Sequence, residues 1–165
     1  MPPTACVDVP ALPLQLLRRR RPDWASCPVV VVERNRPQGV ILWVDARSRR
    51  AGVLPGMRYA EGLSREGSLR AAEVPDSEIR QGMDLLSGAL RRFSPDVEPS
   101  RREPGVFWIA AGGLNRLYPS PRAWAREIRA SLGDLGFRNR VAVGFTKFGT
   151  YASARAGRNR SRRNQ

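Results

Sequence analysis

Apolar residues along this chain fall into two patterns, short continuous runs and runs with helical spacing. The continuous runs "TACVDV", "PVVVVE", "GVILWV" and "NRVAVGF" are typical of short buried strands. The stretch "VEPSRREPGVFWIAAGG" reads as two strands around a tight turn. The predicted strands lie at residues 4–9, 28–33, 39–44, 68–74 and 139–145, with two more inside residues 97–113.

Helical spacing marks the remaining elements. Apolar residues at Ile79, Met83, Leu86 and Leu90 recur every three or four positions, which predicts a helix over 75–92. A second amphipathic helix begins after Ser120, an N-cap residue type, and has Pro121 at its first position. This second helix is expected over residues 120–136. The other expected helices cover residues 10–21, short stretches within 45–53 and 56–65, and a segment that starts near residue 146.

The order of these elements predicts an α+β fold. A strand at 4–9 is followed by a separate lobe from 10 to about 74, and then by helix, strand, strand, helix and strand. Without the lobe the series is β-α-β-β-α-β, the ferredoxin-like arrangement. We therefore expect a ferredoxin-like domain over 4–9 and 75–155 with a small α/β lobe inserted after its first strand. The basic stretch 156–165 is expected to be disordered, either solvated or an electrostatic arm on nucleic acid.

The net charge of the chain indicates the kind of partner that it binds. The chain has a net charge of +14, and its cations are 28 arginines and Lys147. An excess of this size indicates a polyanion, nucleic acid before an anionic membrane. The preference for arginine over lysine has a second explanation, because a GC-rich coding sequence produces it without any function in binding.

Several classes of protein are excluded by what the sequence lacks. It has no histidine, so a Ser-His-Asp triad and histidine-ligated metals are impossible. Cys6 and Cys27 lack the spacing of a zinc site and are expected to be reduced thiols. No apolar run approaches the ~20 residues of a membrane span, and the N-terminus does not read as a secretory signal. We expect a soluble cytoplasmic protein with no membrane partner.

Four stretches, in order, resemble the Y-family of translesion DNA polymerases over residues 4–155. "ACVDVPALPLQLL" is similar to the first palm motif, in which Asp8 occupies the position of a metal-binding aspartate. "PQGVILWVDARSRRAGVLPGM" is similar to the fingers segment that meets the incoming nucleotide. "FSPDVEPSRREPGVFW" resembles the second acidic motif of the palm, and "RVAVGFTKFGTYASA" its closing strand and helix. The resemblance implies a palm with inserted fingers.

The acidic positions depart from the family pattern. The Asp-Glu pair that would bind metal with Asp8 reads Arg102-Glu103 here, and Ala110 stands where related chains often carry another aspartate. Two-metal phosphoryl transfer needs several converging carboxylates, so a productive metal pair is hard to assemble. Asp8 and Glu103 remain the candidate catalytic remnants, with Asp8 as the one candidate metal ligand. No resident cofactor is expected, and Mg²⁺ only if these carboxylates still bind it.

The nucleotide positions depart as well. Asp45-Ala46 stands where the family has Asn-Tyr, and Phe148-Gly149 replaces an Asn-Lys pair, whereas Arg49 matches the arginine that holds the triphosphate. The chain also stops where the thumb and little finger of the family would start. It is therefore expected to be truncated or a reduced relative.

The combination of "LWVDARSRRAGV", "VEPS", "EPGVFW" and "GLNRLYPS" resembles one branch in particular, the ImuB-type proteins, which are taken to be inactive. The resemblance implies a translesion synthesis adaptor in DNA repair and damage-induced mutagenesis, within the SOS response. Its partners would be DNA and, through parts absent here, an error-prone polymerase, the sliding clamp and an ATPase-like accessory protein. Two alternatives stay open: a minimal active translesion DNA polymerase, and a generic basic nucleic-acid-binding module.

Each candidate residue also has a purely structural interpretation. Asp8 is either a metal ligand or the cap of the helix that opens near Pro10, and Glu103 is either catalytic or a turn residue paired with a neighbouring arginine. The aromatics Trp43, Trp108 and Trp124 suit core packing better than base stacking. The candidate nucleotide or phosphate contacts, which could instead form a solvated helix face, are Arg47, Arg49 and Arg50, and the candidate DNA contacts are Arg18, Arg20, Arg155, Arg158, Arg160, Arg162 and Arg163.

Overall fold

The computed structural model describes residues 3–112 and 117–160, and for residues 157–160 it describes the backbone alone. The chain divides into two compact units, one made of residues 1–10 and 83–165 and the other of residues 11–82. The second unit is therefore inserted after the first strand. Its far boundary falls inside a helix, later than the residue 75 at which we expected the palm to resume.

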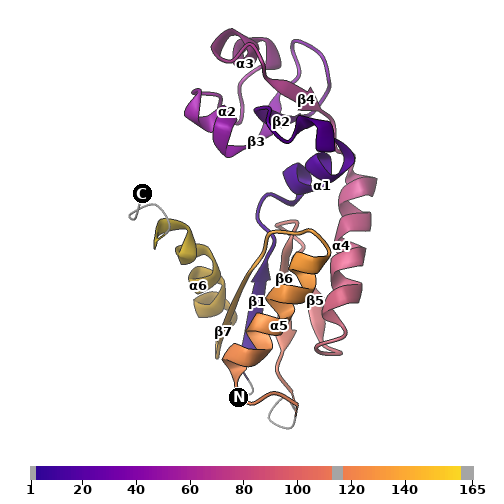
Figure 1. Ribbon diagram of the computed structural model, residues 1–165, viewed down its shortest axis with the longest axis vertical. Coiled ribbons are helices and arrows are strands. Elements are labelled where there is room, and N and C mark those ends of the chain that lie inside the picture. The colour runs from indigo at the N-terminus through magenta and orange to yellow at the C-terminus, as the bar shows by residue number, and fades with distance from the viewer. Residues whose placement is uncertain (1–2, 113–116, 161–165) are drawn as a thin grey trace. The chain divides into compact units, whose positions relative to one another are not determined.

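The first unit is a ferredoxin-like palm (Figure 1). Its sheet has the order β5-β6-β1-β7, and all neighbouring strands in it are antiparallel. Along the chain the order is β-α-β-β-α-β, as predicted from the sequence. The elements are β1 (Thr4–Asp8), α4 (Asp76–Leu90), β5 (Val97–Pro99), β6 (Val106–Ala110), α5 (Pro121–Asp134), β7 (Arg140–Gly144) and α6 (Lys147–Arg160).

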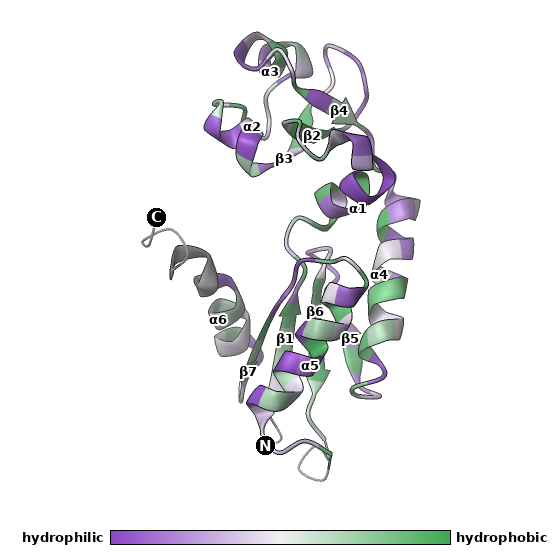
Figure 2. Cartoon of the chain, in the orientation of Figure 1, coloured by the Kyte–Doolittle hydropathy of each residue, from purple (hydrophilic) through white to green (hydrophobic). Residues whose placement is uncertain are grey.

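The two faces of the palm sheet carry alternate residues of each strand. One face is fully apolar, with Ala5, Val7, Phe107 and Ile109 at 0% exposure, and it contributes to the main core. Helices α4 and α5 supply the rest of that core, from the buried residues Leu86, Leu90, Trp124, Ile128 and Leu132. Each of the two helices has apolar residues at helical spacing with polar residues between them, and Figure 2 shows these as green and purple bands.

The other face of the sheet is covered by α6. Ala154 and Tyr151 of α6 pack against Cys6, Val106 and Trp108. The helix continues to Arg160, so the expectation of a disordered tail from residue 156 is wrong for residues 156–160. The rest of that predicted tail, residues 161–165, lies outside the described residues.

The second unit is the small α/β lobe that the sequence predicted. Its sheet has the order β3-β2-β4, with β2 antiparallel to β3 and parallel to β4. The four valines of β2 are all buried, which explains their continuous apolar run. The elements are α1 (Leu12–Arg20), a 3₁₀ turn η1 (Pro22–Trp24), β2 (Val29–Val32), β3 (Ile41–Val44), α2 (Ala46–Arg50), α3 (Tyr59–Arg65) and β4 (Arg70–Ala72).

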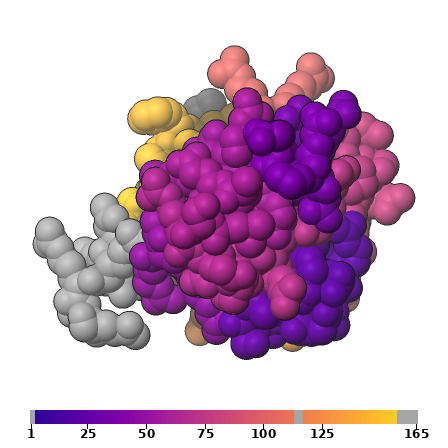
Figure 3. Space-filling model, turned by 90° about the horizontal axis from the view of Figure 1, so that it is seen from above, coloured from indigo at the N-terminus to yellow at the C-terminus, as the bar shows by residue number. Residues whose placement is uncertain are grey.

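Two apolar clusters hold this unit together. One joins β2 and β3 to Val53 and Leu69, and the other joins α1 to the opposite side of β2. In Figure 3 the indigo atoms of the start of the unit and the magenta atoms of its middle form one continuous surface. None of the helices within the described ranges combines the length and the apolar character that a membrane crossing needs.

Candidate functional site

Asp8 ends β1 and is 3% exposed. It lies on the face of the palm sheet that α6 covers, because side chains alternate along a strand and Cys6 is on that face. The residues directly opposite Asp8 on the two flanking strands are Val106 and Arg140. The strand neighbours of Asp8 therefore supply one apolar and one cationic side chain, and no carboxylate.

Glu103 lies in the bend between β5 and β6, where its backbone N–H donates to Ser100 Oγ at 3.1 Å. Its carboxylate is held from α6. The Tyr151 hydroxyl lies 2.8 and 2.9 Å from the two carboxylate oxygens and donates to them, and Arg155 forms an ion pair with Oε2. The sequence predicted a neighbouring arginine as the partner, and that was wrong, because the partners come from a helix about fifty residues further along the chain.

These groups share one electrostatic environment around Cys6. Burial raises the pKa of the Cys6 thiol to about 12, with further contributions from the charges of Asp8 and Glu103, while the charge of Arg155 acts in the opposite direction. Burial and the hydrogen bond to Glu103 likewise raise the pKa of Tyr151. The charges of Asp8, Glu103 and Arg155 therefore act on the same two groups, the Cys6 thiol and the Tyr151 hydroxyl.

This donor set does not fit the metal pair that a polymerase palm would use. Two-metal catalysis places ions ~3.5–4 Å apart, bridged by several carboxylates. The residues that the structure describes contain no group of three or more Asp, Glu, Cys or His side chains that could hold a metal. The single hydroxyl hydrogen of Tyr151 is shared between the two oxygens of Glu103, and Arg155 forms an ion pair with one of them.

The other departures from the family pattern lie apart from this cluster. Arg102 is exposed in the bend. Ala110 pairs with Thr4, at the opposite end of β1 from Asp8. An aspartate at position 110 would lie four residues along the strand from Asp8, about 13 Å at ~3.3 Å per residue. The N-cap position of α1 is Ala11 and not Asp8, so the capping role suggested for Asp8 is wrong.

The predicted nucleotide contacts lie together on α2, in the second unit. Arg47, Arg49 and Arg50 are all exposed on this one short helix. Asp45 is its N-cap and accepts a hydrogen bond from the Ser48 N–H at 2.7 Å. Arg47 donates to the Ala25 carbonyl at 3.3 Å, while Arg49 and Arg50 have no side-chain partner among the described residues.

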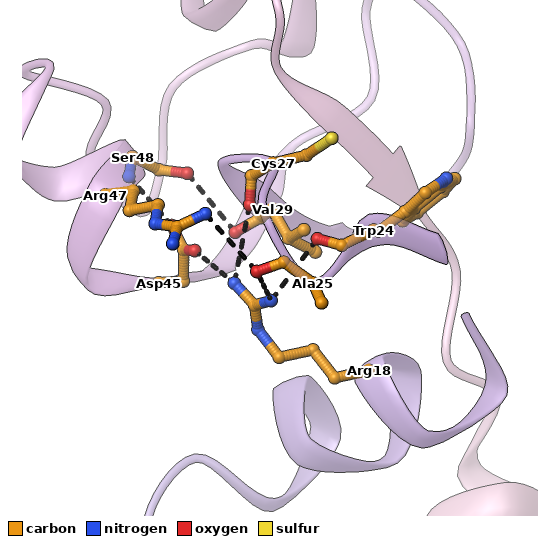
Figure 4. Close-up of polar contacts among 8 residues, drawn as sticks. All are labelled: Arg18, Trp24, Ala25, Cys27, Val29, Asp45, Arg47 and Ser48. Atoms are coloured by element: carbon orange, nitrogen blue, oxygen red, sulfur yellow. Dashed lines mark hydrogen bonds and ion pairs between the residues drawn. The ribbon is translucent and has the colours of Figure 1, made fainter. Parts of the chain in front are cut away.

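Arg18 and Arg20, predicted as DNA contacts, have partners inside the second unit (Figure 4 shows those of Arg18). Arg18 forms an ion pair with Asp45 at 2.5 Å and donates to backbone carbonyls between residues 24 and 27. Arg20 binds Glu78 at 2.5 Å and the Glu73 carbonyl at 2.7 Å.

The arginines of the C-terminal segment are only partly described. Arg155 holds Glu103. The side chains of Arg158 and Arg160, and all of Arg162 and Arg163, lie outside the described residues. As predicted, Trp124 is a core residue at 0% exposure, and Trp43 packs against the α1 cluster.

Lys147 and Trp108 form a contact that the sequence did not indicate. The Lys147 ammonium lies 5.5 Å from the centre of the Trp108 ring and 2.5 Å from Glu98. Trp108 also lies 6.5 Å from the Tyr151 ring. The neighbouring Phe145 and Phe148 are 71% and 83% exposed. No spacing rule predicts such contacts, because their partners come from three different elements.

A ferredoxin-like sheet with a second unit inserted after its first strand, and with an aspartate closing that strand, is the palm-and-fingers arrangement of Y-family polymerases. The chain belongs to the impB/mucB/samB (IMS) family, whose model matches residues 7–150. No curated protein matches the chain.

Solved polymerase structures share this fold. A post-insertion binary complex of Dbh DNA polymerase is similar with a TM-score of 0.74 at 15% identity, over 86% of this chain and 42% of that one. DinB from Sulfolobus solfataricus is similar with a TM-score of 0.74 at 16% identity, over 88% of this chain and 42% of that one. The chain thus spans 42% of the length of these two polymerases, and at such identities the likeness shows the fold.

Proposed function

We propose that this chain is a DNA-binding, polymerase-like module of translesion DNA repair that does not itself synthesise DNA. One observation carries the proposal: Glu103 is bound by Tyr151 and Arg155, while the strand neighbours of Asp8 are Val106 and Arg140. At the positions of the acidic palm motifs two carboxylates are present, Asp8 and Glu103, and neither is arranged to share a metal.

Electrostatics opposes metal capture at Glu103. A divalent ion bound there would lie close to the Arg155 guanidinium. Two unit charges ~4 Å apart repel by about 4 kcal/mol at an effective dielectric constant of ~20, and a divalent ion roughly doubles that figure. The Tyr151 hydroxyl would also lose the acceptor to which it donates. Binding therefore requires that α6 release Glu103 first.

Association with DNA is supported by the family and by the charge of the chain. The net charge of +14 suits a polyanion, and the similar solved structures include complexes of Dbh DNA polymerase. Arg49 and Arg50 are exposed and have no side-chain partner among the described residues, so they are available to phosphates.

We further propose that the chain belongs to the ImuB-type branch and acts as an adaptor in damage-induced mutagenesis. The support is the motif likeness together with the unsuitable metal site. In this role the protein contributes DNA contact and partner binding, while a separate polymerase supplies the chemistry.

Primer extension tests the central claim. The purified protein is incubated with a primed template, Mg²⁺ or Mn²⁺ and all four nucleotides, and binding to the same DNA is followed by fluorescence anisotropy. We expect binding without extension. Templated incorporation that Asp8→Ala abolishes would refute the proposal and identify a minimal translesion polymerase.

A second experiment tests the adaptor role. Immobilised protein is offered a purified sliding clamp, an error-prone polymerase and an ATPase-like accessory protein of the same complex. Retention of any of them supports the adaptor proposal. DNA binding with retention of none would mean that this segment supplies no partner contact of its own, and would favour a generic nucleic-acid-binding module for the segment.

A further inference from the structure

A basic groove of about 560 Å³ lies in the palm unit, and its lining residues do not include Glu103, Tyr151 or Arg155. Part of it is formed by the last turns of α5, and part by the segment that leads into β7. Its cationic lining residues are Arg126 and Arg129 on α5, followed by Arg138 and Arg140. Pro10, Ala130, Gly133, Phe137 and Asn139 complete it.

Three of these arginines are available to a ligand. Arg126 and Arg129 are exposed and have no side-chain partner among the described residues. Arg140 is half-buried, and its Nη1 is a buried nitrogen without a hydrogen-bond partner. Leaving a buried charged donor unpaired is costly, so an unpaired guanidinium nitrogen at a groove suits an anion.

The carbonyl groups near the end of α5 do not bind the guanidinium groups of Arg126 and Arg129. Carbonyl groups at a helix C-terminus attract cations, but the last turn of α5 contains no basic residue. Here the Asn139 side-chain N–H₂ instead donates to the carbonyls of Arg129 and Phe137, both at 3.1 Å. The guanidinium groups of Arg126 and Arg129 are therefore not engaged by the backbone carbonyl groups of the helix end.

Among the residues that the structure describes, the lining of the groove contains no carboxylate. Helix α5 also carries Glu127 and Asp134. The lining positions of the helix, 126, 129, 130 and 133, share one face because they are three or four residues apart. Glu127 and Asp134 lie three and four residues from Ala130, at the edge of that face, and neither of them lines the groove.

We propose that this groove binds the phosphate backbone of nucleic acid. Guanidinium groups bind phosphate in a bidentate manner, and Arg126 and Arg129 are one helical turn apart, close enough to act on the same or adjacent phosphates. A phosphodiester backbone is the occupant that we favour over an acidic peptide, since the chain has a net charge of +14 and its proposed partner is DNA. The inference extends the proposed DNA association to a defined surface.

The test compares two double variants with the same change in charge. Arg126→Gln/Arg129→Gln alters the groove. Arg91→Gln/Arg92→Gln removes two exposed arginines of the same unit that have no side-chain partner among the described residues. Binding of labelled duplex DNA is measured by anisotropy at several salt concentrations. Mass spectrometry after phenylglyoxal treatment records which arginines the DNA protects.

We expect the groove variant to lower the log-log salt slope by about 1.8, because each lost phosphate contact removes about 0.9 on duplex DNA. The control variant should change the slope by less than half as much. Arg126 and Arg129 should be protected by DNA, whereas Arg91 and Arg92 should not. The groove variant should melt no lower than the parent, since removing like charges relieves repulsion.

Equal slopes for the two variants, or modification of Arg126 and Arg129 that is unchanged by DNA, would overturn the inference. Stronger protection by polyglutamate than by DNA would also overturn it and would identify an acidic protein segment as the ligand. The result of this DNA-binding comparison can be told apart from the result of primer extension. An active polymerase would refute the proposed function, and the comparison of the groove variant with its control would still be valid.

Discussion

The hydrogen bonds between Tyr151 and Glu103 should contribute measurably to the stability of the palm. Tyr151→Phe removes only the hydroxyl, which lies 2.8 and 2.9 Å from the two carboxylate oxygens. Glu103→Gln removes the charge and keeps the size of the side chain. The double variant completes a thermodynamic cycle that isolates their interaction.

The magnitude follows from the exposure of the cluster. A hydrogen bond to a charged group contributes about 1.5–3 kcal/mol when it is well buried. The Glu103 and Arg155 side chains are both 39% exposed, so solvent weakens the interaction. We expect a coupling free energy of about 1 kcal/mol between Tyr151 and Glu103. Tyr151→Phe alone should lower the Tm of the 165-residue chain by about 2–4 °C, since 1 kcal/mol shifts Tm by that amount at this size.

Urea unfolding gives the cycle, and hydrogen exchange localises it. Peptides from α6 should exchange faster in Tyr151→Phe and in Glu103→Gln, because both changes loosen the helix from the sheet. Peptides from residues 11–82 should be unaffected, since that unit has its own core. Tyr118→Phe serves as the control, because no hydrogen bond of its hydroxyl is found among the described residues.

A coupling below about 0.3 kcal/mol would refute the reasoning, because it is within the additivity expected of independent sites. Unchanged exchange in α6 would refute it as well. Either result would mean that Glu103 is available to other ligands, and the argument against metal capture at Glu103 would lose its main support.

Three further predictions concern stability. Arg18→Ala should destabilise the second unit by about 1–3 kcal/mol in urea unfolding, because it leaves the half-buried Asp45 carboxylate without its ion pair; a loss under about 0.5 kcal/mol, typical of surface changes, would contradict this. Gly62→Ala should cost about 1–3 kcal/mol, since a Cβ there would lie 2.9 Å from a leucine methyl group. Gly88→Ala, in open space on α4, should gain up to about 1 kcal/mol in the same assay, and similar effects at both glycines would argue against the packing. The Cys6 thiol has its pKa raised from 9.0 to about 12, so its contribution to stability is present below pH 9 and is lost as the pH rises toward 12; the urea midpoint should fall more steeply with pH over that range in the parent than in Cys6→Ser.

The elements of this fold could be predicted from the sequence because each depends on local periodicity. The apolar spacing of Leu86 and Leu90 places the α4 helix, and the Ser120 side chain caps α5 by accepting from the Ala123 N–H at 3.1 Å. The ferredoxin-like order follows from these elements, and the sheet order confirms it. The helix that extends through residues 156–160 was missed because its residues lack apolar spacing.

The contacts of the site could not be predicted because they join residues that are distant in sequence. Arg18 meets Asp45 across 27 residues, and Arg155 meets Glu103 across 52. In a chain with 28 arginines, composition does not show which guanidinium groups have internal partners and which face solvent. Only the folded arrangement separates Arg18 and Arg155, which bind carboxylates, from Arg126 and Arg129, which have no side-chain partner among the described residues.

The loss of carboxylates and the docking of α6 are physically linked. A sheet face that holds metal ions must stay polar and open to substrate. Here the same face carries Cys6, Val106 and Trp108, which gain stability when α6 covers them. Once Val106 stands beside Asp8, the remaining carboxylate at Glu103 is more stable with Arg155 and Tyr151 than exposed beside an apolar surface. A further acid placed on this face would therefore still lie under α6, because the apolar residues there favour the presence of the helix.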